Sequence, residues 1–126
     1  ADMKIDSEKD IDVAARKLID MGPKAVLIKG GHFGSASAAE FTDWLALPDE
    51  PLIALKQPGV KTSNNHGTGC TLSAAIATYL GLGLGIRDAI VHAQKFLNHC
   101  LRHGYAPGLG AGPPNHASWI AKRVGE

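Results

Sequence analysis

One stretch of the sequence decides the fold: Asn64-Asn65-His66-Gly67-Thr68-Gly69-Cys70, which runs directly into Thr71-Leu72-Ser73-Ala74-Ala75-Ile76-Ala77. The pattern is that of a glycine loop that opens a helix. Two glycines separated by one small residue let the backbone turn sharply, and the first turn of the following helix has unpaired N–H groups at the positive end of its dipole. Such groups favour a bound anion, most often a phosphate. The alternative is a turn that only starts a helix, because short glycine patterns are common.

The composition limits the kind of protein. A length of 126 residues predicts one domain with a modest core. The formal net charge is +1 and the basic residues are scattered, so nothing favours a nucleic acid or a membrane surface as partner. No apolar run could span a bilayer, and residues 1–10 are too acidic and polar for a signal peptide, so we expect a cytoplasmic protein. The two cysteines, Cys70 and Cys100, lie far apart in helical patterns, which predicts free thiols.

The N-terminal half has the pattern of an α/β protein. Ser7 is the predicted N-cap of an amphipathic helix that ends at Gly22-Pro23. The continuous apolar run at 25–28 predicts a central strand that is buried on both faces of a parallel sheet. Residues 41–47 and 51–55 are predicted as two shorter strands, forming a hairpin at the edge of the sheet.

The C-terminal half is predicted to be helical. The helix that begins at the glycine loop should end at 81–85, and a second helix from about 87 to 102 should pair with it. Residues 104–114 contain too much glycine and proline for regular structure, and 117–124 predicts a short final helix. Three strands at most would leave half of an α/β sheet exposed.

His66 and Cys70 leave several chemistries open, since they lie four residues apart. They lack further ligands at zinc spacing, so we predict no metal site. A nucleophilic Cys–His pair would need a third, orienting group, and a bound anion would repel a thiolate. A cysteine that acts on a phosphate acceptor, as a base or as a wall of the site, fits the loop better. The remaining alternative is a small buried residue that packs the helix. The other histidines are predicted to be surface or loop residues: His32, His92, His99, His103 and His116.

Three separated motifs resemble one family. The stretch Asn64-x-His66-Gly67-Thr68-Gly69-Cys70-Thr71-Leu72-Ser73 is similar to the signature of the hydroxymethylpyrimidine and phosphomethylpyrimidine kinases of thiamine biosynthesis, a branch of the ribokinase superfamily. The runs Val26-Leu27-Ile28-Lys29-Gly30-Gly31-His32 and Gly108-Leu109-Gly110-Ala111-Gly112-Pro113-Pro114-Asn115-His116 resemble its strand-end and C-terminal motifs. The motifs occur in the family's order. One position differs, because Asn65 stands where the family usually has Thr.

The resemblance implies a doubly wound, mostly parallel sheet flanked by helices. It identifies residues 1–126 as a single partial domain, the C-terminal half of the family's domain, which carries the ATP side and the anion hole. The implied reaction is the ATP- and Mg²⁺-dependent phosphorylation of hydroxymethylpyrimidine and its monophosphate. Two alternatives stay open: a pyridoxal or pyridoxine kinase, and a catalytically incomplete or nucleotide-binding half-domain that needs the N-terminal half.

The resemblance also implies roles for individual residues. Gly67, Thr68 and Gly69 would form the anion hole for the transferring γ-phosphoryl group, and Cys70 would lie nearest the acceptor hydroxymethyl group. The residues implied on the nucleotide side are Lys29, Gly30, Gly31, Asn64 and His66. No protein ligand to a metal is implied. The expected partners are a small-molecule substrate and, because an exposed sheet edge favours association, a second copy of the chain or the N-terminal half.

Overall fold

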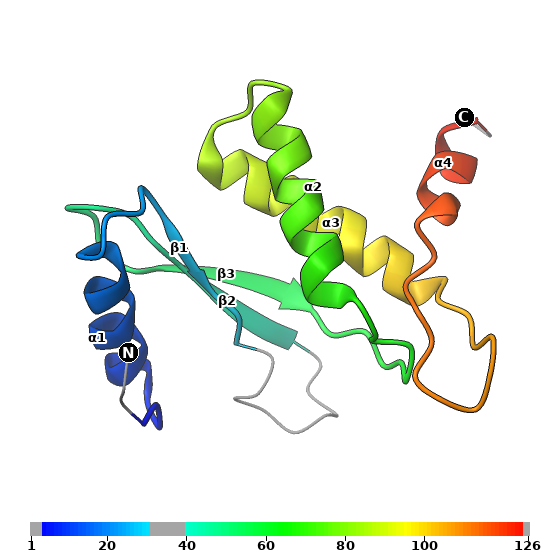
Figure 1. Cartoon of the computed structure of the whole chain (residues 1–126), viewed down its shortest axis with the longest axis horizontal. Helices are drawn as coiled ribbons and strands as arrows, with labels where there is room; N and C mark the ends of the chain where they lie inside the picture. Colours follow the sequence, from blue (N-terminus) through cyan, green and yellow to red (C-terminus); the bar gives the residue numbers. More distant parts are fainter. Residues whose placement is uncertain (1–3, 31–39, 125–126) are drawn as a thin grey trace. The chain divides into compact units, whose positions relative to one another are not determined.

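The computed structural model describes residues 4–30 and 40–124 of the chain. Its elements follow the order α1, β1, β2, β3, α2, α3 and α4 (Figure 1). The chain divides into two compact units, Ala1–Gly59 and Val60–Glu126, which we call the N-terminal and the C-terminal unit. None of the helices in the described residues combines the length and the apolar character needed to cross a bilayer.

Helix α1 (Glu8–Ile19) begins where the sequence predicts. Ser7 is the N-cap, and its hydroxyl accepts a hydrogen bond from the Asp10 backbone N–H at 3.3 Å. The Asp10 carboxylate in turn accepts from the Ser7 hydroxyl at 2.7 Å and from the Asp6 N–H at 3.1 Å. These two donors hold the pKa of Asp10 below its ordinary value. The reciprocal bonds satisfy N–H groups that a helix start leaves without partners.

The predicted hairpin is confirmed. Strands β2 (Glu40–Ala46) and β3 (Ile53–Pro58) pair antiparallel, with Asp43 opposite Leu55 and Leu45 opposite Ile53. Arg16 of α1 fixes the connection between them, since its guanidinium donates to the carbonyl oxygens of Leu47 at 2.8 Å and Glu50 at 2.7 Å. A single side chain therefore ties α1 to both sides of the turn.

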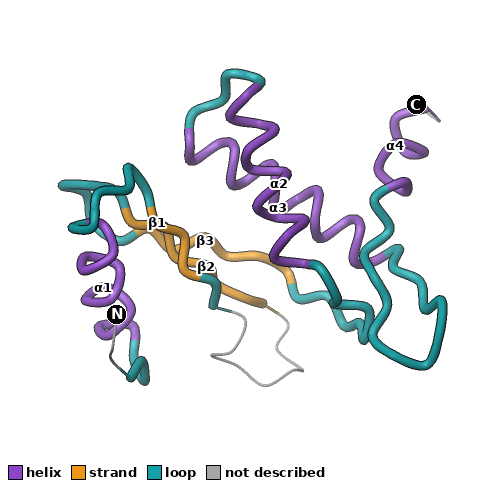
Figure 2. The backbone as a smooth tube through the Cα atoms, in the orientation of Figure 1, coloured by secondary structure: helices purple, strands orange, loops and turns teal. Residues whose placement is uncertain are grey.

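The prediction for residues 25–28 is wrong in two respects. Strand β1 (Val26–Ile28) pairs antiparallel with β2, and the described sheet has the order β1-β2-β3, so β1 is an edge strand. All three of its residues are partly exposed. An apolar run indicates that both faces of a strand are covered, but it carries no information about the direction of the neighbouring strand. Here the neighbour is β2, the next strand along the chain (Figure 2).

The C-terminal unit is helical, as predicted. Helix α2 (Thr68–Gly81) packs against α3 (Ile86–Arg102), and α4 (Ala117–Val124) contacts α3 (Figure 1). Not every large apolar side chain of α2 and α3 is buried, because Leu80 is 40% exposed and Phe96 and Leu101 are half-buried. The buried side chains of this unit include Leu72, Ala75, Ala89, Ile90, Ala93, Leu97 and Cys100.

Candidate functional site: a braced glycine loop at the start of helix α2

The glycine loop opens α2 without any cap of its own. Gly67 is the N-cap residue in the left-handed conformation, with φ 80° and ψ 11°, and makes no side-chain cap hydrogen bond. The Thr71 N–H donates to the Gly67 carbonyl at 2.9 Å. Helix geometry therefore leaves the N–H groups of Thr68, Gly69 and Cys70 without a partner inside α2. The first turn contains no acidic residue, so the positive end of the helix dipole has no compensating charge from the turn itself.

Cys70 lies in the first turn of α2, and its side chain is exposed. The alternative that it is a small buried residue packing the helix is therefore wrong. Both cysteines are free thiols, as predicted, but Cys100 is buried in α3. Burial raises the pKa of the Cys100 thiol, which makes it a poor nucleophile. Of the two cysteines, only Cys70 is placed where a ligand could meet its sulfur.

Residues 112–116, which we call the bracing segment, hold the loop from outside. The Asn64 side-chain oxygen accepts from the Gly112 N–H at 3.1 Å, and the His66 N–H donates to the Gly112 carbonyl at 3.2 Å. A Cβ on Gly112 would lie far inside contact distance of the Tyr105 carbonyl oxygen. The close approach that allows both hydrogen bonds is thus open only to glycine at this position.

The bracing segment also reaches both helices. The Asn115 N–H donates to the Cys100 carbonyl of α3 at 2.9 Å, and His116 Nε2 is hydrogen-bonded to the Thr71 hydroxyl of α2 at 2.8 Å. The structure therefore brings together two of the three predicted motifs. Thr71, Gly112 and His116 all lie in motifs that the sequence analysis identified. Their contacts with one another and with the loop were not predicted, because a motif does not show which distant residues the fold brings next to it.

The strand-end residues lie in the N-terminal unit. The Gly30 N–H donates to the buried Asp43 carboxylate at 3.1 Å, and Lys29 Nζ lies 3.9 Å from the same carboxylate. A Cβ on Gly30 would overlap the Thr42 carbonyl, so this position also requires glycine. Gly31 and His32 lie outside the described residues. A hollow of about 230 Å³ is lined by Gly30 together with Glu8, Ile11, Glu40, Phe41, Thr42 and Trp44.

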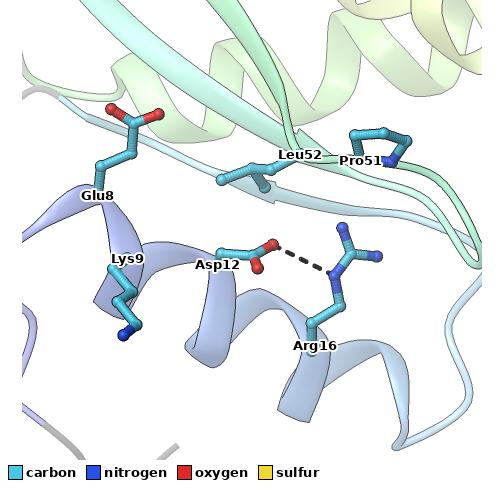
Figure 3. Close-up of a pocket in the computed structure, with 6 residues that line it drawn as sticks. All are labelled: Glu8, Lys9, Asp12, Arg16, Pro51 and Leu52. Carbon is cyan, nitrogen blue, oxygen red and sulfur yellow. Dashed lines mark hydrogen bonds and ion pairs between the residues drawn. The ribbon is translucent and has the colours of Figure 1, made fainter.

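A larger hollow, of about 470 Å³, lies between α1 and the chain that leads into β3 (Figure 3). Its lining residues are Glu8, Lys9, Asp12, Arg16, Pro51 and Leu52, and Arg16 is paired with Asp12 at 3.3 Å. None of the predicted site residues lines it. The guanidinium group of Arg16 is already hydrogen-bonded to the turn between β2 and β3. We therefore assign this hollow no role in the site.

No three His, Cys, Asp or Glu side chains gather into a group that could hold a metal ion within residues 4–30 and 40–124. The site as described consists of backbone N–H donors, one exposed thiol and the residues that brace them.

The comparisons with known proteins bear on this arrangement. The sequence model of the family described as phosphomethylpyrimidine kinase matches residues 1–115. The chain belongs to this family. The hydroxymethylpyrimidine/phosphomethylpyrimidine kinase of Synechococcus elongatus is 42% identical over 118 residues, which make up 92% of this chain and 43% of that protein. The protein of the same name from Haemophilus influenzae is 36% identical over 114 residues, 90% of this chain and 42% of that protein.

Solved structures with a similar fold include those of a pyridoxal kinase. The pyridoxal kinase of Staphylococcus aureus, in complex with AMP-PCP and pyridoxal, matches with a TM-score of 0.82 and 28% identity over 92% of this chain and 42% of that one. The predicted ribokinase-like α/β class is thus confirmed for the part that the chain covers. The chain spans less than half the length of the curated relatives and solved structures named here.

Proposed function

We propose that the chain carries the phosphoryl-binding loop of an ATP-dependent kinase that phosphorylates hydroxymethylpyrimidine and its monophosphate. The observation that carries this proposal is the start of α2, where Gly67 gives no side-chain cap and three N–H groups have no partner inside the helix, beside the exposed thiol of Cys70. Family membership supports it, since the curated relatives are named for this activity. Nucleotide binding is supported by the S. aureus pyridoxal kinase structures with AMP-PCP and with ADP.

The loop suits phosphoryl transfer because that reaction depends on positioning and on preorganised donors. Charge spreads over the equatorial oxygens of the γ-phosphoryl group in the transition state. The N–H groups of Thr68, Gly69 and Cys70 would donate to those oxygens, and the dipole of α2 would favour the charge. By the family resemblance, Asn64 and His66 would contact the nucleotide, and the same role is proposed separately for Lys29, Gly30 and Gly31. Mg²⁺, when bound, would neutralise part of the phosphate charge.

We assign Cys70 the role of general base. As the hydroxymethyl oxygen bonds to the γ-phosphorus, the bond from phosphorus to the β,γ-bridging oxygen breaks and ADP leaves. The hydroxyl proton passes to the sulfur of Cys70 in its thiolate form, whose charge the positive end of the α2 dipole would favour against the repulsion of the bound phosphate. Its exposed position in the first turn lets it meet an acceptor next to the bound phosphate. The buried Cys100 offers no such position.

A second candidate is the phosphorylation of pyridoxal or pyridoxine. It is favoured by the 28% identity to the S. aureus pyridoxal kinase, which has been solved with pyridoxal bound. The chain covers 42% of that protein, and the groups that choose between a pyrimidine and a pyridine need not lie in it. A third candidate is that the 126 residues are inactive alone and need the N-terminal half of the family's domain, which the present sequence does not include.

The test is an ADP-release assay on the product of the complete reading frame, with MgATP and either hydroxymethylpyrimidine, its monophosphate or pyridoxal. We expect the highest kcat/KM with the pyrimidines. Cys70→Ala should lower kcat about 100-fold, as expected for the loss of a general base, while the matched Cys100→Ala variant stays within about twofold of wild type. Turnover of pyridoxal but not of the pyrimidines would favour the second candidate. Activity of the complete product but not of the 126 residues alone would favour the third.

A further inference from the structure

Thr71 uses its hydroxyl differently from Ser73 and Thr78, two other hydroxyl residues of α2. Ser73 and Thr78 donate back to the carbonyl oxygens of Gly69 and Ala74, at 2.9 Å in both cases. This is the usual use of a helical hydroxyl. The Thr71 hydroxyl is instead hydrogen-bonded to His116 Nε2 at 2.8 Å, across 45 residues of sequence. Thr71 is also buried, at 8% exposure, directly after Cys70.

Thr71 is therefore held from two sides. Its N–H donates to the carbonyl of Gly67, the left-handed N-cap residue, at 2.9 Å, and its side chain is tied to His116. The N–H groups proposed to bind phosphate belong to the three residues between Gly67 and Thr71. Fixing both ends of this turn fixes the direction in which those N–H groups point.

The backbone on both sides of His116 is anchored, and the residue itself is exposed. Its neighbour Asn115 donates to the Cys100 carbonyl at 2.9 Å, and the His116 carbonyl accepts from the Trp119 N–H at 3.3 Å, at the start of α4. Its ring lies 6.3 Å from the ring of Phe96 on α3, measured between centroids. Through its hydrogen bond to Thr71, the imidazole connects the first turn of α2 to the backbone next to α3 and α4.

We propose that His116 is a positioning residue for phosphoryl transfer, acting through the Thr71 hydroxyl on the first turn of α2. This inference rests on the proposed function, since it assigns the orientation of the proposed phosphate-binding N–H groups to a residue that acts through Thr71. The bond should matter most when charge develops on the phosphoryl oxygens, because preorganised donors act in the transition state. It should therefore affect kcat more than the KM for the alcohol.

Steady-state kinetics on the product of the complete reading frame test this directly. His116→Ala and Thr71→Val should each lower kcat roughly tenfold or more, because small misplacements of catalytic groups are costly, with the KM for hydroxymethylpyrimidine within about twofold of wild type. His116→Gln, whose side-chain amide can keep a hydrogen bond to Thr71, should restore most of kcat. The matched controls are Thr78→Val in α2 and His92→Ala on the exposed side of α3, and both should leave kcat unchanged.

The double variant decides whether the two residues act as a pair. If they work through one bond, His116→Ala combined with Thr71→Val should be no slower than the slower single variant. The inference would be overturned if the two losses in kcat multiply in the double variant. It would also be overturned if the single variants raise KM and keep kcat, or if the two control variants lose as much kcat.

A second measurement separates this inference from the proposed function. Amide hydrogen exchange should be about tenfold or more faster at Thr71 in His116→Ala and at residue 71 in Thr71→Val, because the first turn of α2 then opens more readily. Thr78→Val should leave exchange at Thr71 unchanged. If wild type phosphorylates none of the alcohols, the proposed function fails, and unaltered exchange at residue 71 would still overturn the positioning role by itself.

Discussion

Gly112 should be among the least replaceable residues of the C-terminal unit, and Gly112→Ala tests the reason. A Cβ at this position would overlap the Tyr105 carbonyl oxygen and lie 2.6 Å from the Asn64 side-chain oxygen. Ordinary contacts of a Cβ begin near 3.4 Å, so relief of the overlap with the Tyr105 carbonyl oxygen requires the backbone to move by more than an ångström. The bonds from the Gly112 N–H to Asn64, at 3.1 Å, and from the His66 N–H to the Gly112 carbonyl, at 3.2 Å, cannot survive such a shift.

The magnitude follows from those two bonds. Each contributes about 1 kcal/mol net, and a buried group left without a partner costs about 1–3 kcal/mol. We therefore expect Gly112→Ala to lower the free energy of unfolding by about 2–4 kcal/mol. Gly110 provides the matched control, because a Cβ there would meet nothing within 4 Å. Gly110→Ala should leave the free energy of unfolding unchanged or raise it by up to about 1 kcal/mol.

Urea unfolding followed by far-ultraviolet circular dichroism measures the free energy of unfolding of both variants and wild type. An unchanged slope of the transition would show that all three expose the same amount of surface on unfolding. Calorimetric titration with AMP-PCP adds the functional readout, since a released glycine loop should bind the nucleotide more weakly. A Gly112→Ala protein whose free energy of unfolding lies within about 0.5 kcal/mol of the Gly110→Ala value would refute the bracing role.

Three further predictions concern single side chains, and urea unfolding measures each. Arg16→Lys should lower the free energy of unfolding by about 1–2 kcal/mol, because one ammonium cannot reproduce the forked contact with two carbonyls of the turn; an unchanged value would contradict this. Asp43→Ala should lower it by about 1–3 kcal/mol by leaving the buried Gly30 N–H without an acceptor, and Asp43→Asn should lose less. The raised pKa of Cys100 means that the folded state keeps its proton longer than the unfolded state, so stability should fall as the pH rises through the ordinary thiol pKa of about 8.5. Cys100→Ala should remove that fall, whereas Cys70→Ala should keep it.

Local signals in the sequence located most of the elements. The short helix at 117–124 has the predicted bounds, and the second long helix begins one residue before the predicted start. Ser7 caps α1 because its hydroxyl and the Asp10 carboxylate are three residues apart, a spacing that acts within one turn. Such features depend on neighbours in sequence, and a sequence displays those neighbours directly.

Pairing between strands was harder to predict, for a physical reason. The apolar run at 25–28 correctly predicts a strand, but its direction relative to β2 depends on how the chain returns through residues that carry no periodic pattern. The hairpin of β2 and β3 was predictable because a short turn joins its strands, and a short turn permits only antiparallel pairing.

The same distinction between neighbouring and distant residues applies to the candidate site. The glycine loop and the helix that it opens could be predicted from residues 64–77 alone, but the exposure of Cys70 could not. The contacts of His116 could not, since an isolated histidine in a loop shows no partner until the fold places Thr71 beside it. Likewise the need for glycine at position 112 comes from Tyr105 and Asn64, which lie 7 and 48 residues away.

These observations explain why a glycine loop of this kind is accompanied by a second motif far along the chain. A helix start usually stabilises itself with a capping side chain and an acidic residue in its first turn. Helix α2 has neither, and both would compete with a phosphate for the same N–H groups. A loop that keeps its donors free for a ligand must therefore obtain its rigidity from elsewhere, and here the bracing segment supplies it through Asn64, His66 and Thr71. On the proposed function, the glycine loop should therefore bind phosphate weakly once its contacts with the bracing segment are lost.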